Sequence, residues 1–359
     1  MSNNKNLAII DPHIHLWDPY TTPRITSSLI KLFGWNPRLY RAICKLLIPK
    51  AAQAFLGDAQ YLIYPYLPND YQKDISTHKV QSIVHVQAGW EKKSGIGAAG
   101  ETKWLEQIFS SETASNNFKL DAIIGQAHLE KVTALSTLIE NHQKSSHRFV
   151  GIRDMLAWSD DPGVMKWGKC AELSNTKEWR QGFEMLAEHN LSFDAWIYHT
   201  QLTELNKLAC TYPSQQIILD HMATPIGLMG PFAGFGHTKK DRDLILKQWQ
   251  EGIALLAENK NVAVKLSGMF MPIVGWNLHQ VSSQPSTTEI VDKLQPLIEF
   301  TLEQFGVDRC IFASNFPMDK VSLSYQQLYD IYKEMVQGRS MEEQEMLFAK
   351  NAQRIYKIA

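Results

Sequence analysis

Residues 9–17 read Ile-Ile-Asp-Pro-His-Ile-His-Leu-Trp. Residues 7–10 form a short apolar run that ends at a turn-prone Asp-Pro pair, a pattern that predicts a buried strand. Two histidines follow, and residues two apart in extended backbone point the same way. We therefore expect His13 and His15 to enter one space, where two imidazoles suit one metal ion. Taken alone the pattern is weak, because polar residues that cap a strand would give the same sequence.

The length and composition fit a single globular domain with a large core. The chain has 359 residues, of which 44% are hydrophobic and 20% charged, and a barrel of this length is common. The net charge of -1 creates no overall field that favours nucleic acid or an anionic membrane. We therefore expect a small-molecule substrate, with no nucleic-acid or membrane partner, and a homo-oligomer is compatible with these features.

The cysteines and the first residues indicate a cytoplasmic protein. No Cys-x-x-Cys pair occurs, so free thiols in a reducing compartment are expected. Residues 1–6 are polar and lack the apolar core of a leader peptide. No apolar run approaches the ~20 residues of a membrane span. The four cysteines lie far apart in the sequence, at Cys44, Cys170, Cys210 and Cys310.

A long segment rich in aromatic residues and proline, residues 18–74, follows the first strand. Apolar residues at helical spacing, with basic residues between them, predict an amphipathic helix over residues 29–47. A basic amphipathic face can contact a membrane, but packing on its own domain agrees better with the neutral overall charge. Long loops in compact domains are often lids. We expect this insertion to cover the mouth of the active site.

The rest of the chain alternates between strand-like and helix-like segments. Strands alternating with helices predict a parallel sheet, and eight such units predict an α/β fold of the (β/α)8 TIM-barrel type, spanning residues 1–359 as one domain. An open doubly wound sheet is the alternative, but no Gly-x-Gly-x-x-Gly follows the first strand. The eight predicted strands cover residues 7–10, 80–87, 121–126, 148–153, 191–197, 216–220, 262–266 and 309–313.

Polar side chains stand at the ends of these strands. In a TIM barrel the active site lies at the C-terminal ends of the strands, so these residues should converge on one mouth. The other histidines, including His78 and His142, fit surface or loop positions and receive no role. Besides the opening pair, the residues expected at the mouth are His85, Gln87, Gln126, His128, Arg153, Asp154, Trp196, Tyr198, His199, Asp220, His221, Lys265, Ser267, Ser314, Asn315 and Asp319.

Several motifs, taken together and in order, resemble the amidohydrolase superfamily. They are IDPHIHLWDP, GIRDMLAW, FDAWIYHTQL, ILDHMATPIG, VAVKLSGM and RCIFASNFPMDK. They look like the branch often called amidohydrolase-2, which contains 2-pyrone-4,6-dicarboxylate lactonase and sugar-acid lactonases. The resemblance implies His13, His15 and His199 around a divalent metal, zinc or manganese, or around the reacting carbonyl, with His221 nearby. Lactonases of this branch do not depend strictly on a metal, so the two opening histidines could hold substrate instead.

The sequence departs from the superfamily pattern at two strand ends. Arg153 stands where two-metal members carry a carbamylated lysine, and arginine stays protonated and cannot bridge metals. We therefore expect one metal ion or none. Asn315 replaces the superfamily's catalytic aspartate, and an amide does not take a proton from water. Asp319 is the nearest carboxylate in sequence.

These features predict a hydrolase that opens a small lactone or related cyclic ester. Asn315 would orient water or the carbonyl, and His221 and Asp319 complete the expected catalytic set. Gln87, Arg153, Trp196 and Tyr198 are the expected substrate contacts; Arg153 either clamps a substrate carboxylate or forms a salt bridge with a barrel carboxylate. The alternatives are a metal-dependent non-oxidative decarboxylase and a binding protein that has lost catalysis with the replaced aspartate.

Overall fold

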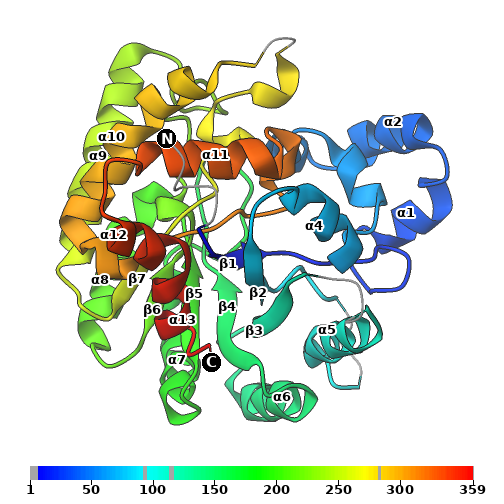
Figure 1. Cartoon of the computed structure of the whole chain (residues 1–359). Coiled ribbons are helices and arrows are strands. Elements are labelled where there is room, and N and C mark those ends of the chain that lie inside the picture. The colour runs from blue at the N-terminus through cyan, green and yellow to red at the C-terminus, as the bar shows by residue number, and fades with distance from the viewer. Residues whose placement is uncertain (1–6, 92–94, 113–116, 282–283, 359) are drawn as a thin grey trace.

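Eight parallel strands surrounded by helices form the body of the protein (Figure 1). The computed structural model describes residues 7–91, 95–112, 117–281 and 284–358. Residues 1–6, on which the expected absence of a leader peptide rests, lie outside the described residues. Each strand pairs in parallel with the next along the chain, which confirms the predicted (β/α)8 TIM barrel. The strands are β1 (Ile9–Ile14), β2 (Val80–Val86), β3 (Lys119–Gln126), β4 (Phe149–Met155), β5 (Ser192–Trp196), β6 (Ile217–Leu219), β7 (Val262–Leu266) and β8 (Cys310–Phe312).

The barrel helices pack outside the strands, each against its neighbours, as α5 does on α6 and α8 on α9. Capping residues mark where helices begin. At the start of α10 the hydroxyl of Ser286 accepts from Glu289 N–H, which is part of a capping box. None of the described helices is long and apolar enough to cross a bilayer. The helices after the second strand are α5 (Ala99–Glu112), α6 (Val132–Ser145), α7 (Lys177–Glu188), α8 (Leu202–Thr211), α9 (Lys239–Ala257), α10 (Thr287–Phe305), α11 (Tyr325–Met335), α12 (Met341–Glu345) and α13 (Asn351–Ile355).

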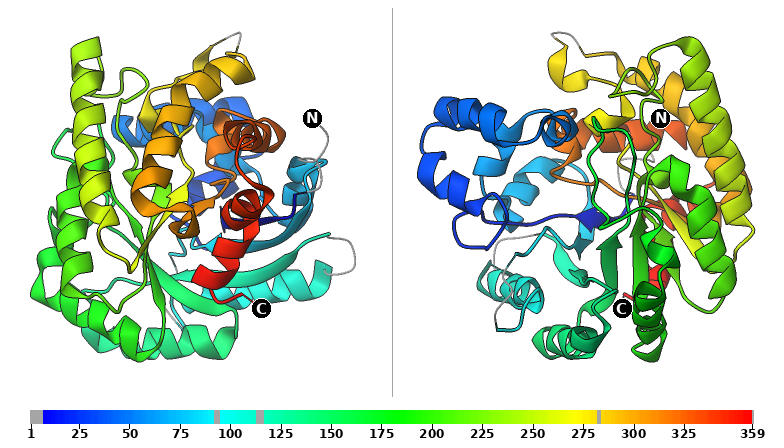
Figure 2. Two further views of the ribbon diagram at one scale, coloured as in Figure 1. Left: turned by 60° about the vertical axis from the view of Figure 1, so that its left-hand side comes forward. Right: turned by 180° about the vertical axis from the view of Figure 1, so that it is seen from behind.

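The insertion between β1 and β2 differs from its prediction. The single helix expected over residues 29–47 is two helices, because the chain turns through Gly34 to Asn36 and Pro37 starts the second helix. In Figure 1 and the right-hand view of Figure 2, α1 and α2 lie at the outer edge of the molecule, on the side away from α9. The insertion contains α1 (Ser27–Phe33), α2 (Pro37–Leu47), α3 (Lys50–Leu56) and α4 (Pro68–Ile75).

The barrel closes between its first and last strands through the segment after β8. The backbone N–H of His15 donates to the carbonyl of Phe316 at 2.8 Å, and that of Asn315 donates to the carbonyl of His13 at 2.9 Å. The buried carboxylate of Asp11 reinforces this seam, because it accepts from Ser314 N–H at 2.9 Å. Closing the barrel therefore brings His13 and His15 next to Asn315, which lies at the far end of the chain.

Two of the histidines expected at surface or loop positions are buried. His142 is fully buried in α6, where its ring stacks on Phe149 with 4.6 Å between centroids and its Nδ1 lies 2.8 Å from the Thr102 hydroxyl. His78 is also buried and lies 2.9 Å from Lys333 Nζ. His78 lies in the loop between α4 and β2, as expected, whereas the position of His142 inside a helix was predicted wrongly. The burial of both was missed because the groups that cover them come from distant segments.

Candidate active site

Buried polar side chains gather at the C-terminal end of the barrel, on β1, β4 and β7 and in the turn after β6. The rings of His13 and His15 meet edge to face, with 4.9 Å between centroids and 3.2 Å between their Nε2 atoms. His13 lies inside β1, which runs two residues past its predicted Asp-Pro end. The expectation that the two imidazoles enter one space is confirmed.

A buried lysine links the histidine pair to two carboxylates. Lys265 on β7 has no exposed surface, and its Nζ lies 2.6 Å from Asp194, 3.0 Å from Asp220 and 3.0 Å from Nδ1 of His13. Asp194 also accepts from the hydroxyl of Tyr356 at 3.1 Å. Because each buried carboxylate has a cation or a donor beside it, the charges of this cluster compensate one another.

The contacts of His15 fix the position of its proton. Nδ1 of His15 lies 2.7 Å from the carbonyl oxygen of Val86, so it carries hydrogen and leaves Nε2 as an acceptor. Nδ1 of His13 lies 3.0 Å from the ammonium of Lys265 and 3.3 Å from Asp220, and its Nε2 lies 3.2 Å from Nε2 of His15 and 3.3 Å from Nη1 of Arg153. Each nitrogen of His13 therefore faces a cation that can only donate a hydrogen bond.

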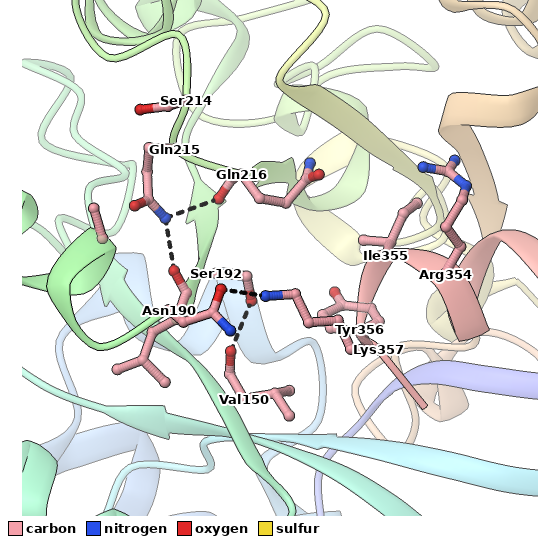
Figure 3. Close-up of a pocket in the computed structure, with 12 residues that line it drawn as sticks. Val150, Asn190, Ser192, Ser214, Gln215, Gln216, Arg354, Ile355, Tyr356 and Lys357 are labelled. Carbon is pink, nitrogen blue, oxygen red and sulfur yellow. Dashed lines mark hydrogen bonds between the residues drawn. The ribbon is translucent and has the colours of Figure 1, made fainter. Parts of the chain in front are cut away.

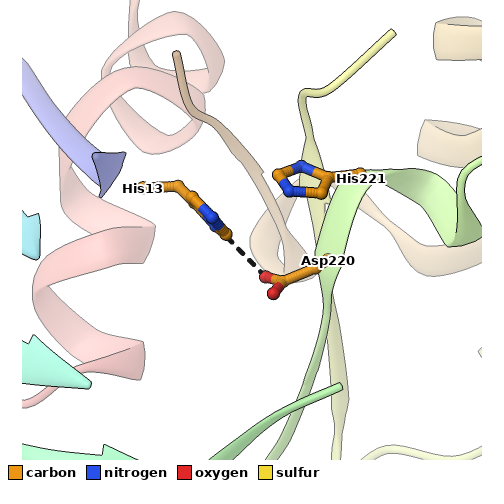
Figure 4. Close-up of side chains that lie close together, drawn as sticks. All are labelled: His13, Asp220 and His221. Carbon is orange, nitrogen blue, oxygen red and sulfur yellow. Dashed lines mark ion pairs between the residues drawn. The ribbon is translucent and has the colours of Figure 1, made fainter. Parts of the chain in front are cut away.

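Asp220 and His221 face the opening pair from the turn after β6 (Figure 4). Oδ1 of Asp220 lies 3.3 Å from Nδ1 of His13, and the rings of His13 and His221 are 4.4 Å apart. The Nδ1 of His221 is 2.9 Å from the Ser267 hydroxyl. Residues 221–224 all have positive φ, between 36° and 60°, in a run without glycine. Strained backbone of this kind is typical of functional sites, where surrounding packing holds it.

Burial and the neighbouring cations set the protonation of this cluster. Burial lowers the pKa of His221 to about 3 and that of His13 well below its usual range. Burial alone would raise the pKa of Asp220, but Lys265 and His13 together hold it well below its usual range. Burial raises the pKa of Asp194 to about 6 against the opposing effect of Lys265. Neutral imidazoles beside an ionised carboxylate are the protonation states that metal ligands require.

The donor set fits one divalent cation. One nitrogen each of His13 and His221 and one carboxylate oxygen of Asp220 lie within 4.8 Å of one another, and all three residues are buried. A second cation does not fit, because Nη1 of Arg153 lies 3.3 Å from Nε2 of His13 and 3.6 Å from Asp220.

His199, the third predicted metal ligand, lies apart from these donors. Its Nδ1 accepts from the backbone N–H of Ile226 at 3.3 Å, and its buried Nε2 has no hydrogen-bond partner. Burial lowers its pKa to about 4. A second candidate ligand group among the described residues consists of His128, Glu130 and Asp154, and neither group includes His199. Its role as a ligand stays a prediction.

The turn after β8 carries Asn315 and Asp319, which contact each other. Nδ2 of Asn315 donates to Oδ1 of Asp319 at 3.0 Å, while Oδ2 of Asp319 is buried without a partner. Burial raises the pKa of Asp319 to about 8, and the hydrogen bond from Asn315 only partly opposes it. A carboxyl group with this pKa can exchange a proton near neutral pH.

Arg153 on β4 is held between a carboxylate and a backbone oxygen. Its Nη2 donates to the carbonyl of Gln87 at 2.8 Å, and its Nη1 lies 3.6 Å from Asp220. The side-chain amide of Gln87 accepts from Gly89 N–H through Oε1, and its buried Nε2 has no partner. Of the two predicted roles for Arg153, the barrel salt bridge is present, with Asp220 rather than Asp154 as the partner.

The predicted aromatic wall consists of Trp196 and Tyr198. The indole N–H of Trp196 donates to the Thr224 hydroxyl at 3.0 Å, and its ring lies 6.3 Å from that of His221. The hydroxyl of Tyr198 donates to the carbonyl of Met165 at 2.7 Å. Phe55 of the insertion contacts Trp196 at 5.8 Å between centroids, so α3 reaches the same end of the barrel.

A cavity of about 430 Å³ lies at the opposite end of the barrel (Figure 3). Val150, Ser192 and Gln216, which line it, stand at or beside the starts of β4, β5 and β6. Tyr356 also lines the cavity, and its hydroxyl donates to Asp194 from the cavity side of the barrel. The cavity is therefore separate from the histidine cluster.

Comparisons with known proteins place the chain in a family. A family model described as amidohydrolase matches residues 130–358. An uncharacterized protein of Sinorhizobium fredii, y4mH, is 31% identical over 353 residues, covering 98% of this chain and 99% of the relative. The chain belongs to the amidohydrolase family. An L-fucono-1,5-lactonase of Burkholderia multivorans is 22% identical over 294 residues, which cover 81% of this chain and 88% of that enzyme.

Solved structures of amidohydrolases share the fold. An amidohydrolase of Burkholderia multivorans with bound zinc superposes with a TM-score of 0.70 at 18% identity, covering 98% of this chain and 100% of the other. A probable 2-pyrone-4,6-dicarboxylic acid hydrolase of Acinetobacter baumannii with bound citric acid gives 0.61 at 15% identity, covering 98% and 99%. These matches agree with the resemblance read from the motifs.

Sequence reasoning missed one member of the site and left another without a role. Asp194 lies in the middle of β5, and Lys265, although it was expected at the mouth, received no function. A charged residue inside an apolar strand is rare unless it is paired. FDAWI and VAVKL each contain one, with opposite signs, and that signal could have predicted the contact between Asp194 and Lys265.

Proposed function

We propose that this amidohydrolase opens a small lactone, or a related cyclic ester, that carries carboxylate or hydroxyl groups. The observation that supports this most is the buried cluster of His13, Asp220 and His221 beside two cations, Lys265 and Arg153. In the reaction, the oxygen of water bonds to the ring carbonyl carbon, the ring C–O bond breaks, and the ring oxygen gains a proton. The product is a hydroxy acid, and the acid releases a proton to solvent.

A single divalent metal ion, zinc or manganese, fits the proposal. The ligands expected from the sequence are His13, His15 and His199, whereas the group gathered in the structure is His13, Asp220 and His221. When bound, such an ion polarises a carbonyl and lowers the pKa of its water. The Burkholderia amidohydrolase that contains zinc supports a metal of this kind.

The remaining residues orient substrate and move protons. Asp319, with a pKa raised to about 8 by burial, accepts a proton from water, and Asn315 holds that carboxyl group in place. With the metal ligands expected from the sequence, His221 stays free to transfer a proton to the leaving ring oxygen. Arg153 holds a substrate carboxylate by charge, with Gln87 supporting its guanidinium. Trp196 and Tyr198 provide the apolar wall.

The insertion, residues 18–74, is proposed to cover the mouth and exclude water. Contact between Phe55 and Trp196 supports this position. All four cysteines are free, which agrees with the reducing cytoplasm as the proposed location.

A panel of sugar lactones and pyrone carboxylates tests the activity. Wild type is expected to turn over at least one compound with one acid released per ring opened, measured by pH-stat. Asn315→Asp serves as the comparison, because it restores the superfamily carboxylate beside Asp319. An inactive wild type with an active Asn315→Asp variant would indicate a degenerate binding site. Release of carbon dioxide in place of ring opening would indicate a decarboxylase.

Metal content measured on the same preparations separates the two ligand sets. We expect about one zinc or manganese per chain in wild type and a loss of it in the double variant His13→Ala, His15→Ala. His199→Ala should lower metal content if the sequence-based set is right, and Asp220→Asn should do so if the structural group is right. Full occupancy in the double variant would reject both sets.

A further inference from the structure

The insertion exposes an unusual number of large apolar side chains. Eight of the twelve that are exposed in the described part of the chain lie between residues 20 and 64. Ile25 is 85% exposed, Leu46 84% and Trp35 74%. Scattered single apolar residues are normal on a surface, but such a concentration on one element marks an interaction site.

The same segment is strongly basic. Residues 19–57 contain six lysines and arginines and no acidic residue, although the whole chain has 36 basic and 37 acidic residues. Arg41 pairs with Asp58, whereas no ion pair is found among the described residues for the other exposed cations. Those cations are Lys31, Arg38, Lys45 and Lys50.

Helix α2 divides into three stripes. Tyr40 and Cys44, four residues apart, face the protein and are buried. Leu39 and Leu46, seven residues apart, share a second face and are exposed. Arg38, Arg41 and Lys45 recur at intervals of three and four on a third face, all exposed. The sequence predicts that this helix packs on its own domain. That packing therefore uses only part of the apolar surface of the helix.

We propose that the insertion docks on the surface of an anionic lipid bilayer through α1, α2 and the turns beside them. We name this region the insertion surface; it comprises Ile25, Lys31, Leu32, Trp35, Arg38, Leu39, Lys45, Leu46, Leu47 and Lys50. Exposed Trp and Leu beside a basic stripe is the pattern of a helix that lies in the lipid headgroup region. The cytoplasmic leaflet carries the matching negative charge, and each nearby Lys or Arg adds attraction.

Charge and shape favour a bilayer over other occupants. A symmetric contact between two copies would bring the same unpaired cations together, which is unfavourable. The two helices lie at the outer edge of the molecule in Figure 1 and in the right-hand view of Figure 2, so their side chains can reach a flat surface. The proposal is independent of the lactonase assignment.

Flotation with vesicles tests the proposal on the full-length protein. Wild type is expected to float with vesicles made of equal amounts of phosphatidylcholine and phosphatidylglycerol, and not with phosphatidylcholine alone. Raising the salt concentration should release it, because salt screens charge attraction. Lys45→Glu with Leu46→Glu should reduce binding at least about tenfold, since reversing a charge near the surface removes attraction and adds repulsion.

A matched control comes from the opposite side of the molecule. Leu244→Glu with Lys247→Glu changes one exposed apolar and one exposed basic residue of α9, and should leave vesicle binding unchanged. Circular dichroism and urea denaturation confirm that both double variants fold. Equal binding to both vesicle types, or an equal loss in the two variants, would overturn the proposal. So would a dimer in sedimentation velocity that Lys45→Glu with Leu46→Glu dissociates, because the surface would then join two copies.

Discussion

Asp220 and Asp319 are both fully buried at the mouth of the barrel, yet their pKa values move in opposite directions. Asp220 lies beside Lys265 and His13, which hold its pKa well below the usual range. Asp319 has only the neutral amide of Asn315 and a backbone N–H, and burial raises its pKa to about 8. The difference teaches that the charge of the partner, and not depth, decides whether a buried carboxyl group ionises. Such a separation assigns one group to holding charge and the other to exchanging protons.

Removing the ammonium group beside Asp220 should have the largest effect on stability. Lys265→Met leaves Asp194 and Asp220 buried without their ammonium, and we expect a loss of about 3–5 kcal/mol in the free energy of unfolding. Urea denaturation at pH 7 measures it. Lys144→Met, which removes an exposed pair with Glu140, is the control and should change stability little. A comparable small change in Lys265→Met would mean that the cluster is not held together by charge.

Replacing Asp319 by a residue that cannot ionise should change the activity and its pH dependence. With a pKa of about 8, Asp319 is protonated at pH 7, so kcat/KM should rise as the pH increases through 8. Asp319→Asn should lower kcat/KM by about 10²–10⁴-fold and abolish this rise, because it removes the proposed general base. A variant that keeps the rising limb would assign it to another group.

The same carboxyl group should also affect stability. Its folded pKa of about 8 lies above the unfolded value near 4. Between these values the folded state binds the extra proton, so the contribution of Asp319 to stability falls as the pH rises and levels off above 8. Urea midpoints between pH 5 and 9 should therefore fall less in Asp319→Asn than in wild type.

The smallest effect is expected at a half-exposed contact nearby. His128 lies 3.5 Å from Asp154, and this partner raises the pKa of the imidazole. This contact stabilises the fold at pH values below the pKa of the unfolded state. The stabilisation is lost as the pH rises through the pKa of the folded state. Because the ring is 50% exposed, solvent screens the pair, and His128→Ala should cost at most about 0.5 kcal/mol at pH 5. No difference should remain at pH 8 in thermal denaturation.

The sequence predicts the barrel well because each strand is a short local run. The apolar stretches around residues 217–219 and 262–266 need no distant information to be recognised, and Ser286 with Glu289 identifies the start of α10. The pairing of His13 with His15 follows from the two-residue period of extended backbone. These features depend on neighbours in the chain.

The rest of the site depends on partners far apart in the sequence. Lys265 meets Asp194 across 71 residues, and Asp220 meets His13 across more than 200. No local pattern states which buried charges face each other, so the predicted ligand set took His199 from the family pattern while the structure gathers Asp220 and His221. The burial of His78 and His142 escaped prediction for the same reason.

The seam between β1 and β8 has a consequence for biosynthesis. His13 is held by Asn315 N–H, and Asp11 by Ser314 N–H and the hydroxyl of Tyr325 at 3.2 Å. A nascent chain that has emerged from the ribosome as far as β7 already contains nearly every polar residue of the mouth, but lacks the groups that fix the first strand. The first strand is therefore fixed only after the segment that follows β8 has been translated, so a polypeptide that terminates before Ser314 would lack the contacts that hold Asp11 and His13 in place.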